Sequence, residues 1–166
     1  VKAETIPLKN CSLTLFNDMT LNETIVLSAE KCPIFTIRGN GHTIFSPVPC
    51  HAFTQNRLRR HLTNADNASL PQLVIFDTIF DGSGIGGGFS IEGDITILNS
   101  SNVHFTRNQE SVLFSQNGSI RILNSNEISF ANNSATQGGA IRVAQNDLII
   151  EHSTIQFLNN RIENDN

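Results

Sequence analysis

Residues 86–109 read GGGFSIEGDITILNSSNVHFTRNQ, residues 111–134 read SVLFSQNGSIRILNSNEISFANNS, and residues 138–161 read GGAIRVAQNDLIIEHSTIQFLNNR. These are three versions of one unit, because apolar residues occupy the same positions in each. A repeat of this length indicates a structural unit that stacks on its neighbours. The apolar columns that the alignment predicts are Phe89, Phe114 and Ile141; Ile95, Ile120 and Leu148; Ile97, Ile122 and Ile150; Val103, Ile128 and Ile155; and Phe105, Phe130 and Phe157.

Each unit consists of short apolar alternations such as Ile95-x-Ile97 and Val103-x-Phe105. Alternation with a period of two, in β-branched and aromatic residues, is typical of strands. The segments are too short for helices, and Asn, Ser, Gly and Gln between them favour turns. We therefore predict an all-β fold, a right-handed parallel β-helix with rungs of about 25 residues. In this fold each strand pairs with the equivalent strand of the next rung, about 4.8 Å away.

Two columns are expected to run along the whole repeat region as structural ladders. The phenylalanine column extends upstream to Phe80, and we place its rings in the interior, where they stack. The asparagine column lies at a corner, where amide side chains hydrogen-bond along the stack and tolerate left-handed backbone. An outward, sugar-binding row of rings is the alternative, but the rings share the alternation phase of the inward aliphatic residues. The members of the two ladders are Phe80, Phe105, Phe130 and Phe157, and Asn108, Asn133 and Asn160.

The chain of 166 residues is expected to form one β-helix domain, residues 1–166. Residues 1–20 are predicted to cap the first rung, because an open rung exposes a strand edge. Residues 73–160 are predicted to form the repeat rungs. No cap pattern follows Asn160, so we expect an uncapped C-terminal end that further rungs or a partner cover.

Residues 46–71 interrupt the pattern and are bracketed by prolines. We predict a projecting loop, since loops on a rigid scaffold commonly carry binding residues. A solvated basic excursion is an equal alternative. The candidate partner-binding residues in this loop are Arg57, Arg59, Arg60 and His61.

The three cysteines, Cys11, Cys32 and Cys50, lie about one rung apart. Three disulfide pairings are possible, and buried unpaired thiols are an equal alternative. Cys50-His51 with His61 is a weak metal signature, because a second close pair of ligands is missing. The run Gly86-Gly87-Gly88 is not a phosphate loop, because neither Lys-Ser/Thr nor a helix pattern follows it. We therefore predict no catalytic residues, no metal and no cofactor.

Composition narrows the possible partners. The net charge is −4, with 11 Lys and Arg against 15 Asp and Glu, which argues against a nucleic-acid surface. No apolar run reaches the roughly 20 residues of a membrane-spanning helix. The chain begins at Val1 without Met, so it is either processed or a segment, and we favour a secreted or cell-surface setting. Six glycosylation sequons occur, at Asn10, Asn22, Asn67, Asn99, Asn117 and Asn132.

The motifs Gly138-Gly139-Ala140-Ile141 and Phe130-Ala131-Asn132-Asn133 resemble the paired GGA(I/L/V) and FxxN repeats of the chlamydial polymorphic outer-membrane proteins. Residues 86–89 stand where GGAI does but depart from it, and residues 111–114 depart fully. The resemblance covers roughly residues 80 to 160, while the opening part looks like pectin-lyase-like β-helices in general. Further FxxN matches begin at Phe53, Phe105, Phe114 and Phe157.

The resemblance implies a surface-displayed autotransporter passenger at the outer membrane, with an adhesin role and a protein or glycan partner on a cell surface. Our first hypothesis is accordingly a non-enzymatic adhesion or recognition module that belongs to a longer protein. A structural building block that contacts neighbouring subunits is the alternative.

A polysaccharide lyase or hydrolase is the third hypothesis and needs clustered carboxylates beside a basic residue. The early rungs offer only the acidic group Asp77, Asp81, Glu92 and Asp94. Arg121 and Arg142 occupy outward positions with no recurring carboxylate beside them in the sequence. We therefore expect no enzymatic activity.

Overall fold

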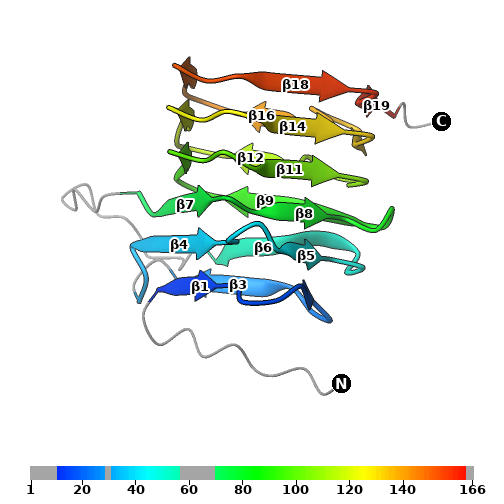
Figure 1. Cartoon of the computed structure of the whole chain (residues 1–166), viewed down its shortest axis with the longest axis horizontal. Coiled ribbons are helices and arrows are strands. Elements are labelled where there is room, and N and C mark those ends of the chain that lie inside the picture. Colours follow the sequence, from blue (N-terminus) through cyan, green and yellow to red (C-terminus); the bar gives the residue numbers. More distant parts are fainter. Residues whose placement is uncertain (1–10, 29–30, 57–69, 164–166) are drawn as a thin grey trace.

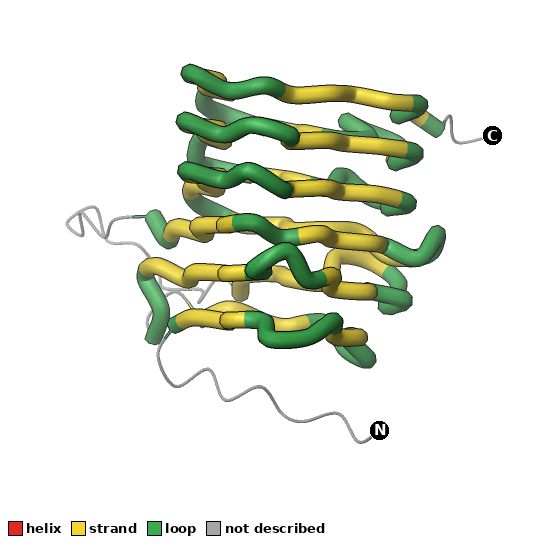
Figure 2. The backbone as a smooth tube through the Cα atoms, viewed as in Figure 1, coloured by secondary structure: helices red, strands yellow, loops and turns green. Residues whose placement is uncertain are grey.

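The computed structural model describes residues 11–28, 31–56 and 70–163, and within these ranges all regular structure is β (Figure 2). The strands coil into a parallel β-solenoid of about five turns, with the rungs stacked one above another (Figure 1). Each strand pairs in parallel with its equivalent in the next rung, as between β10 (Asp94–Leu98) and β13 (Ile120–Leu123). The predicted parallel β-helix is confirmed.

Three parallel sheets form the sides of the coil. The first sheet contains β1 (Ser12–Thr14), β4 (Ile34–Arg38), β7 (Gln72–Phe76), β10, β13 and β17 (Leu148–Glu151). The second contains β2 (Met19–Thr20), β5 (Thr43–Phe45), β8 (Ile79–Asp81), β11 (Val103–Thr106), β14 (Ile128–Ala131) and β18 (Ile155–Leu158). The third contains β3 (Ile25–Ser28), β6 (Cys50–Asn56), β9 (Gly86–Ile91), β12 (Leu113–Ser115) and β16 (Ile141–Val143). A short pair, β15 (Ser134–Ala135) and β19 (Arg161–Ile162), follows the second sheet.

The phenylalanine column follows the second sheet on its interior side, as predicted, with Phe80, Phe105 and Phe130 fully buried and Phe157 of the last described rung half exposed. Phe80 pairs with Phe105, Phe105 with Phe130, and Phe130 with Phe157. The rings of Phe105 and Phe130 stack with centroids 5.0 Å apart, and those of Phe130 and Phe157 with centroids 5.2 Å apart. Stacked rings contribute about 0.5–1.5 kcal/mol per pair beyond the burial of their surface. An outward sugar-binding row is therefore wrong for this column.

The column predicted from Phe89, Phe114 and Ile141 is wrong by one residue in its middle rung. Leu113, not Phe114, pairs with Phe89 and Ile141, and Leu113 is fully buried. Phe114 faces outward, where the guanidinium of Arg142 lies 4.5 Å from its ring centroid. Because side chains alternate between faces, a shift of one position moves a residue from the core to the surface.

The asparagine ladder forms along one corner of the coil, as predicted. Asn133 Oδ1 accepts hydrogen bonds from the backbone N–H and the Nδ2 of Asn108, at 3.0 and 2.8 Å. Asn160 Oδ1 accepts the same two hydrogen bonds from Asn133, at 3.1 and 2.9 Å. The second Nδ2 hydrogen of Asn133 goes to the carbonyl of Phe105. The amide of Asn133 thus links its own rung to the rung on either side, between Asn108 and Asn160.

The left-handed backbone at this corner belongs to the residue before each ladder asparagine, so our explanation of the asparagines as turn residues is wrong. Arg107, Asn132 and Asn159 have φ values of 54°, 56° and 53°. The ladder asparagines therefore contribute to this corner through their amide hydrogen bonds. The left-handed position instead tolerates arginine as well as asparagine.

A second polar ladder, which the sequence analysis did not anticipate, runs along the corner between the first and second sheets. We call it the serine ladder. Ser125 Oγ accepts from the N–H of Ser100 and donates to Leu123 O, and Ser153 Oγ accepts from the N–H of Ser125. Thr78 takes the place of serine in the earlier rung, where its hydroxyl donates to the carbonyl of Phe76. Burial of these hydroxyls is tolerated because each is hydrogen-bonded.

Two predicted boundaries change. Residues 12–14 and 19–20, expected within an N-terminal cap, are strands β1 and β2 of the first rung, which pair with β4 and β5. Residues 50–56, expected within a projecting loop, form β6, which pairs with β3 and β9. Phe53 explains this, because its buried ring stacks on Phe89 with centroids 4.9 Å apart. The rest of the predicted cap (residues 1–10) and of the loop (residues 57–69) lies outside the described residues.

Cys11 and Cys32 form a disulfide that closes the first rung, across a sequence separation of 21 residues. The sequence left three pairings open, and the coil selects this one by bringing the two Cα atoms to 5.2 Å. Joining Cys11 to Cys32 restricts the unfolded chain and so stabilises the folded one.

We expect the Cys11→Ser, Cys32→Ser double variant to lower the free energy of unfolding by about 3 kcal/mol, the value for a loop of this length. Urea denaturation with and without dithiothreitol measures the effect. Reduction should destabilise the parent chain and leave the double variant unchanged. Equal sensitivity of both proteins to dithiothreitol would contradict the assignment.

Candidate functional site

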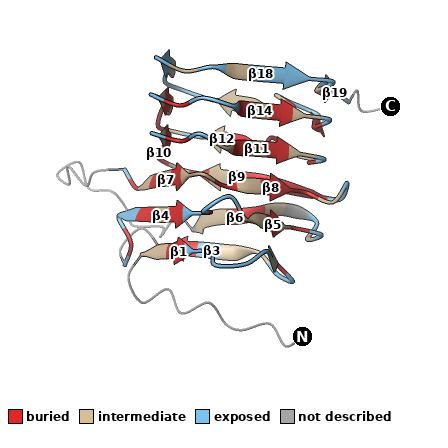
Figure 3. Cartoon of the chain, viewed as in Figure 1, coloured by how far each residue is buried: buried red, intermediate tan, exposed pale blue. Residues whose placement is uncertain are grey.

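The last described rung presents an apolar surface at one end of the solenoid. We define this end face as the interior-side and edge residues of β17, β18 and β19. Figure 3 shows exposed residues in β18, whereas β14, β11 and β8 of the same sheet are buried or intermediate. The large apolar side chains exposed there, with their exposed fractions, are Leu148 45%, Ile150 44%, Phe157 52% and Ile162 65%.

The opposite end of the solenoid differs. The inward residues Leu13, Leu15 and Leu21 of the first rung are 7%, 4% and 4% exposed. The inward positions of the first rung are therefore buried, whereas the equivalent positions of the last described rung are exposed. Phe16, in the turn after β1, is 78% exposed.

The end face combines this apolar surface with directed polar groups. A hollow of about 340 Å³ lies there, bordered by Gly139, Ile141, Phe157, Asn160 and Ile162 among others. In the two lower rungs the backbone N–H of the ladder asparagine donates to the amide oxygen of the next asparagine. The N–H of Asn160 has no such partner among the described residues. The end face thus contains the backbone N–H of Asn160 and the exposed ring of Phe157.

The acidic residues that a lyase would require are occupied in contacts between rungs. Asp81 is buried and pairs with Arg107, whose Nε lies 3.0 Å from Asp81 Oδ1. Asp94 Oδ2 lies 2.6 Å from Arg121 Nη1, and its other oxygen accepts from Ser119 N–H. Arg121 therefore has a carboxylate partner that the sequence analysis did not foresee.

The remaining two acidic residues of this group also bind neighbouring rungs. Asp77 Oδ1 accepts from the N–H of Ser101 at 2.8 Å, and Glu92 Oε1 accepts from Asn117 Nδ2 at 3.0 Å. The four carboxylates thus serve as links along the coil, each with its own partner, and do not converge on one point. Within the described ranges no three His, Cys, Asp or Glu residues are placed to hold a metal ion.

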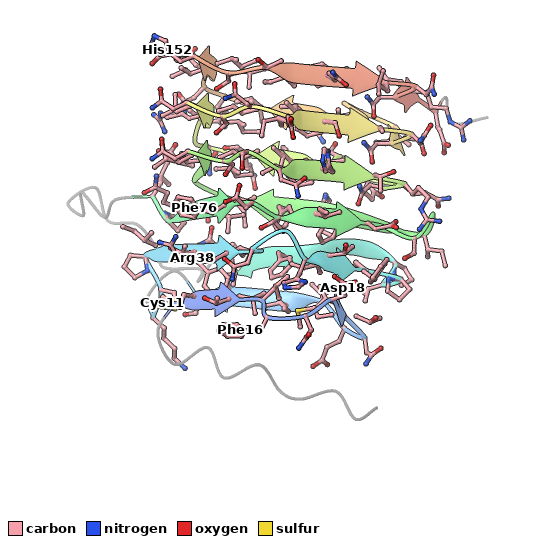
Figure 4. The ribbon with its side chains drawn as sticks, viewed as in Figure 1. Cys11, Phe16, Asp18, Arg38, Phe76 and His152 are labelled. Atoms are coloured by element: carbon pink, nitrogen blue, oxygen red, sulfur yellow. A yellow bond between two sulfur atoms is a disulfide. The ribbon has the colours of Figure 1, made fainter. Side chains whose placement is uncertain are left out.

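Two arginine–phenylalanine pairs lie on the outer faces. Arg38 on β4 covers the ring of Phe76 on β7, with 4.4 Å between the guanidinium carbon and the ring centroid (Figure 4). Arg142 covers Phe114 in the same way on the third sheet. Such pairs contribute about 0.5–1 kcal/mol at exposed positions. They also show that outward arginines cover aromatic surface of the solenoid itself.

The sequence-predicted partner residues Arg57, Arg59, Arg60 and His61 lie outside the residues that the structure describes. The flanking strands β6 and β7 place the ends of that segment at the third and first sheets. The serine ladder could have been found from the sequence, because Leu-Asn-Ser occurs at residues 98–100 and again at 123–125. The Arg121–Asp94 pair carries no such signal, since its partners lie 27 positions apart.

His51 on β6 is a histidine whose pKa the fold changes. Burial lowers its pKa below the ordinary value of 6.5, and the charge of Glu110 raises it in part. Its Nε2 is buried without a hydrogen-bond partner in the described part of the chain. Folding therefore favours the neutral form of His51.

Because the folded pKa of His51 lies below the unfolded one, the unfolded chain binds the proton more readily. The contribution of neutral His51 to the free energy of unfolding is fully present above about pH 6.5, the pKa in the unfolded chain. This contribution is lost as the pH falls through the lower pKa of the folded state. His51→Gln, which does not titrate, should flatten the loss of unfolding free energy between pH 7 and pH 5. Urea denaturation at half-unit pH steps measures this, with His152→Gln, an exposed position, as the control. Parallel profiles for His51→Gln and the parent chain would refute the assignment.

No helix among the described residues is long and apolar enough to span a membrane. Comparison with protein-family models, with curated proteins and with solved structures finds no match to this chain.

Proposed function

We propose that this chain is a non-enzymatic extracellular recognition module, of the adhesin kind that its resemblance to autotransporter passenger repeats implies. The proposal rests on the observation that the polar side chains along the coil form hydrogen bonds and ion pairs between rungs. The asparagine and serine ladders and the four carboxylates bind neighbouring rungs, so their chemistry maintains a rigid, regular scaffold. A scaffold of this kind serves to present surfaces and loops to a partner.

The Cys11–Cys32 disulfide supports a secreted or cell-surface location. Disulfides persist in oxidising compartments and are rare in reducing cytosol. The partner class that we propose is a protein or glycan on a cell surface, bound through the basic segment with Arg57, Arg59 and Arg60.

The test is binding of fluorescently labelled chain to cultured epithelial cells. We expect saturable binding that the triple variant Arg57→Ala, Arg59→Ala, Arg60→Ala weakens at least tenfold. The triple variant Arg38→Ala, Arg142→Ala, Arg161→Ala removes equal charge from described outer positions and should bind nearly as well as the parent chain. Pretreatment of the cells with protease or with glycosidase separates a protein partner from a glycan partner.

The outcome against this function is enzymatic turnover. Measurable depolymerisation of polygalacturonate, with or without Ca²⁺, would replace the recognition role by a lyase or hydrolase role. If both triple variants weakened cell binding equally, the binding would be nonspecific attraction between charges. That result would refute the proposed recognition site.

A further inference from the structure

We propose that the outer face of the first sheet binds a second copy of this chain, with the two coils running in opposite directions. The first sheet lies along one side of the stacked rungs (Figure 1). A continued coil adds rungs above or below, so it would leave this side face uncovered. The inference goes beyond the recognition role and does not depend on it.

One column of outward residues crosses this face, with one residue from each of five consecutive rungs. The residue before each of them is an isoleucine on the interior side of the sheet, and because side chains alternate, the column points outward. The register is set by the strand pairs β4–β7, β7–β10, β10–β13 and β13–β17. From β4 to β17 the column consists of Arg38, Phe76, Leu98, Leu123 and Glu151.

The centre of this column is apolar. Phe76, Leu98 and Leu123 are half-buried and follow one another on three rungs. Contiguous apolar side chains on an outer face favour contact with another apolar surface. The second sheet differs, because its outward column on the same three rungs is mostly polar. That column consists of Asp81, Thr106 and Ala131.

The two ends of the column carry opposite charges. Arg38 and Glu151 are exposed, and neither has an ion-pair partner in the part of the chain that the structure describes. Arg38 lies over the Phe76 ring (Figure 4), so its position is fixed while the N–H groups in the guanidinium plane stay available. Two further charged residues on this face, Asp94 and Arg121, pair with each other at 2.6 Å and add no net charge.

A column that runs from a cation through an apolar centre to an anion is complementary to its own reverse. A rotation of 180° about an axis along β10 reverses the order of the rungs and keeps the direction of the strands. Leu98 then meets the second copy's Leu98, and Phe76 meets the second copy's Leu123. Arg38 meets the second copy's Glu151. Each unlike contact therefore occurs twice, as in any two-fold interface, and the two sheets pack face to face with aligned strands.

The size of the face predicts a weak dimer. Four rung steps give it a height of about 19 Å, and strands of up to five residues give it a width of about 16 Å. Such an area belongs to the class of weak complexes, and we expect a dissociation constant of the order of 100 µM. The chain is then a monomer at the lower concentrations of the cell-binding test, so the two tests are independent.

The experiment is sedimentation equilibrium of the full chain from about 10 µM to about 1 mM, on either side of that constant. Arg38→Glu and Glu151→Arg should each weaken dimerisation at least tenfold, because like charges then meet twice. Arg142→Glu makes the same charge change on the third sheet and should leave dimerisation unchanged. Far-ultraviolet circular dichroism checks that every variant keeps the β fold.

The decisive sample is an equimolar mixture of Arg38→Glu with Glu151→Arg. In a dimer of one chain of each kind, every charge at the ends of the column meets an opposite charge. We therefore expect the mixture to associate about as tightly as the parent chain, and the double variant to do so alone. Leu98→Asp places two carboxylates on the axis and should abolish association, whereas Phe114→Asp on the third sheet should not.

Three results would overturn the inference. A mixture that associates no more tightly than its two components would refute the opposed arrangement of the coils. A dimer that Leu98→Asp leaves intact would use another surface. A parent chain that sediments as a monomer at every concentration would exclude a second copy, and the face would then serve contact with a different protein.

Discussion

Phe130→Ala is expected to lower the free energy of unfolding by about 3–5 kcal/mol, the range for removing a buried aromatic ring. Phe130 is fully buried, and its ring stacks between those of Phe105 and Phe157. The substitution opens a cavity that backbone hydrogen bonds on both sides prevent from closing. Urea denaturation followed by far-ultraviolet circular dichroism measures the change.

The matched control is Phe114→Ala, which removes the same ring from a neighbouring rung. Phe114 faces outward under Arg142, so its loss should lower the free energy of unfolding by about 1 kcal/mol or less. Both variants lose one phenylalanine ring. The difference between their losses of unfolding free energy therefore measures the effect of placing the ring in the interior. A loss at Phe130 no greater than that at Phe114 would mean that Phe130 is not in the core.

Asn133→Ala is expected to lower the free energy of unfolding by about 3 kcal/mol or more. Asn133 is fully buried, and its amide oxygen accepts both hydrogen bonds from Asn108. Alanine leaves those donors without their acceptor, and it removes the amide hydrogens that Asn133 donates to Asn160 Oδ1 and to the carbonyl of Phe105. Each unsatisfied buried polar group costs about 1–3 kcal/mol.

Asn132→Gly is the control for this position. Asn132 is exposed with a φ of 56°, a conformation that glycine adopts freely, so its replacement should change stability by less than about 1 kcal/mol. Hydrogen exchange at the Asn108 amide gives a second measurement, since only Asn133→Ala removes its acceptor. Similar effects of the two substitutions would show that the corner depends on backbone conformation rather than on the amide ladder.

Much of the fold was predictable because the interior repeats with the chain. Phe105, Phe130 and Phe157 lie in register as their spacing predicts, and Asn108, Asn133 and Asn160 form the expected ladder. An error arose where two apolar residues are adjacent. Leu113 and Phe114 are both suitable for the core, and only the register with Phe89 decides between them.

The FxxN motif shows the same limit. The matches that begin at Phe105, Phe130 and Phe157 lie along the second sheet, and their asparagines form the ladder. The match that begins at Phe53 places its phenylalanine inside the third sheet, and the one at Phe114 places it outside. The four-residue FxxN motif therefore does not specify which sheet of the coil a segment occupies.

For the candidate site, the uncapped C-terminal end stays a prediction. The exposure of the Phe157 ring in the last described rung is seen only once the rungs below are in place. The basic residues Arg57, Arg59, Arg60 and His61 remain a prediction from composition.

The sequence by itself determined the stacking of rungs. Residues of the same kind recur about every 25 positions, and a coil with one turn per repeat places them over one another. Only the tertiary structure decided the pairing of Cys11 with Cys32, the outward position of Phe114 and the partners of the four carboxylates. These depend on contacts between residues some 20 to 30 positions apart, whose alignment is set by the backbone register and not by any local pattern.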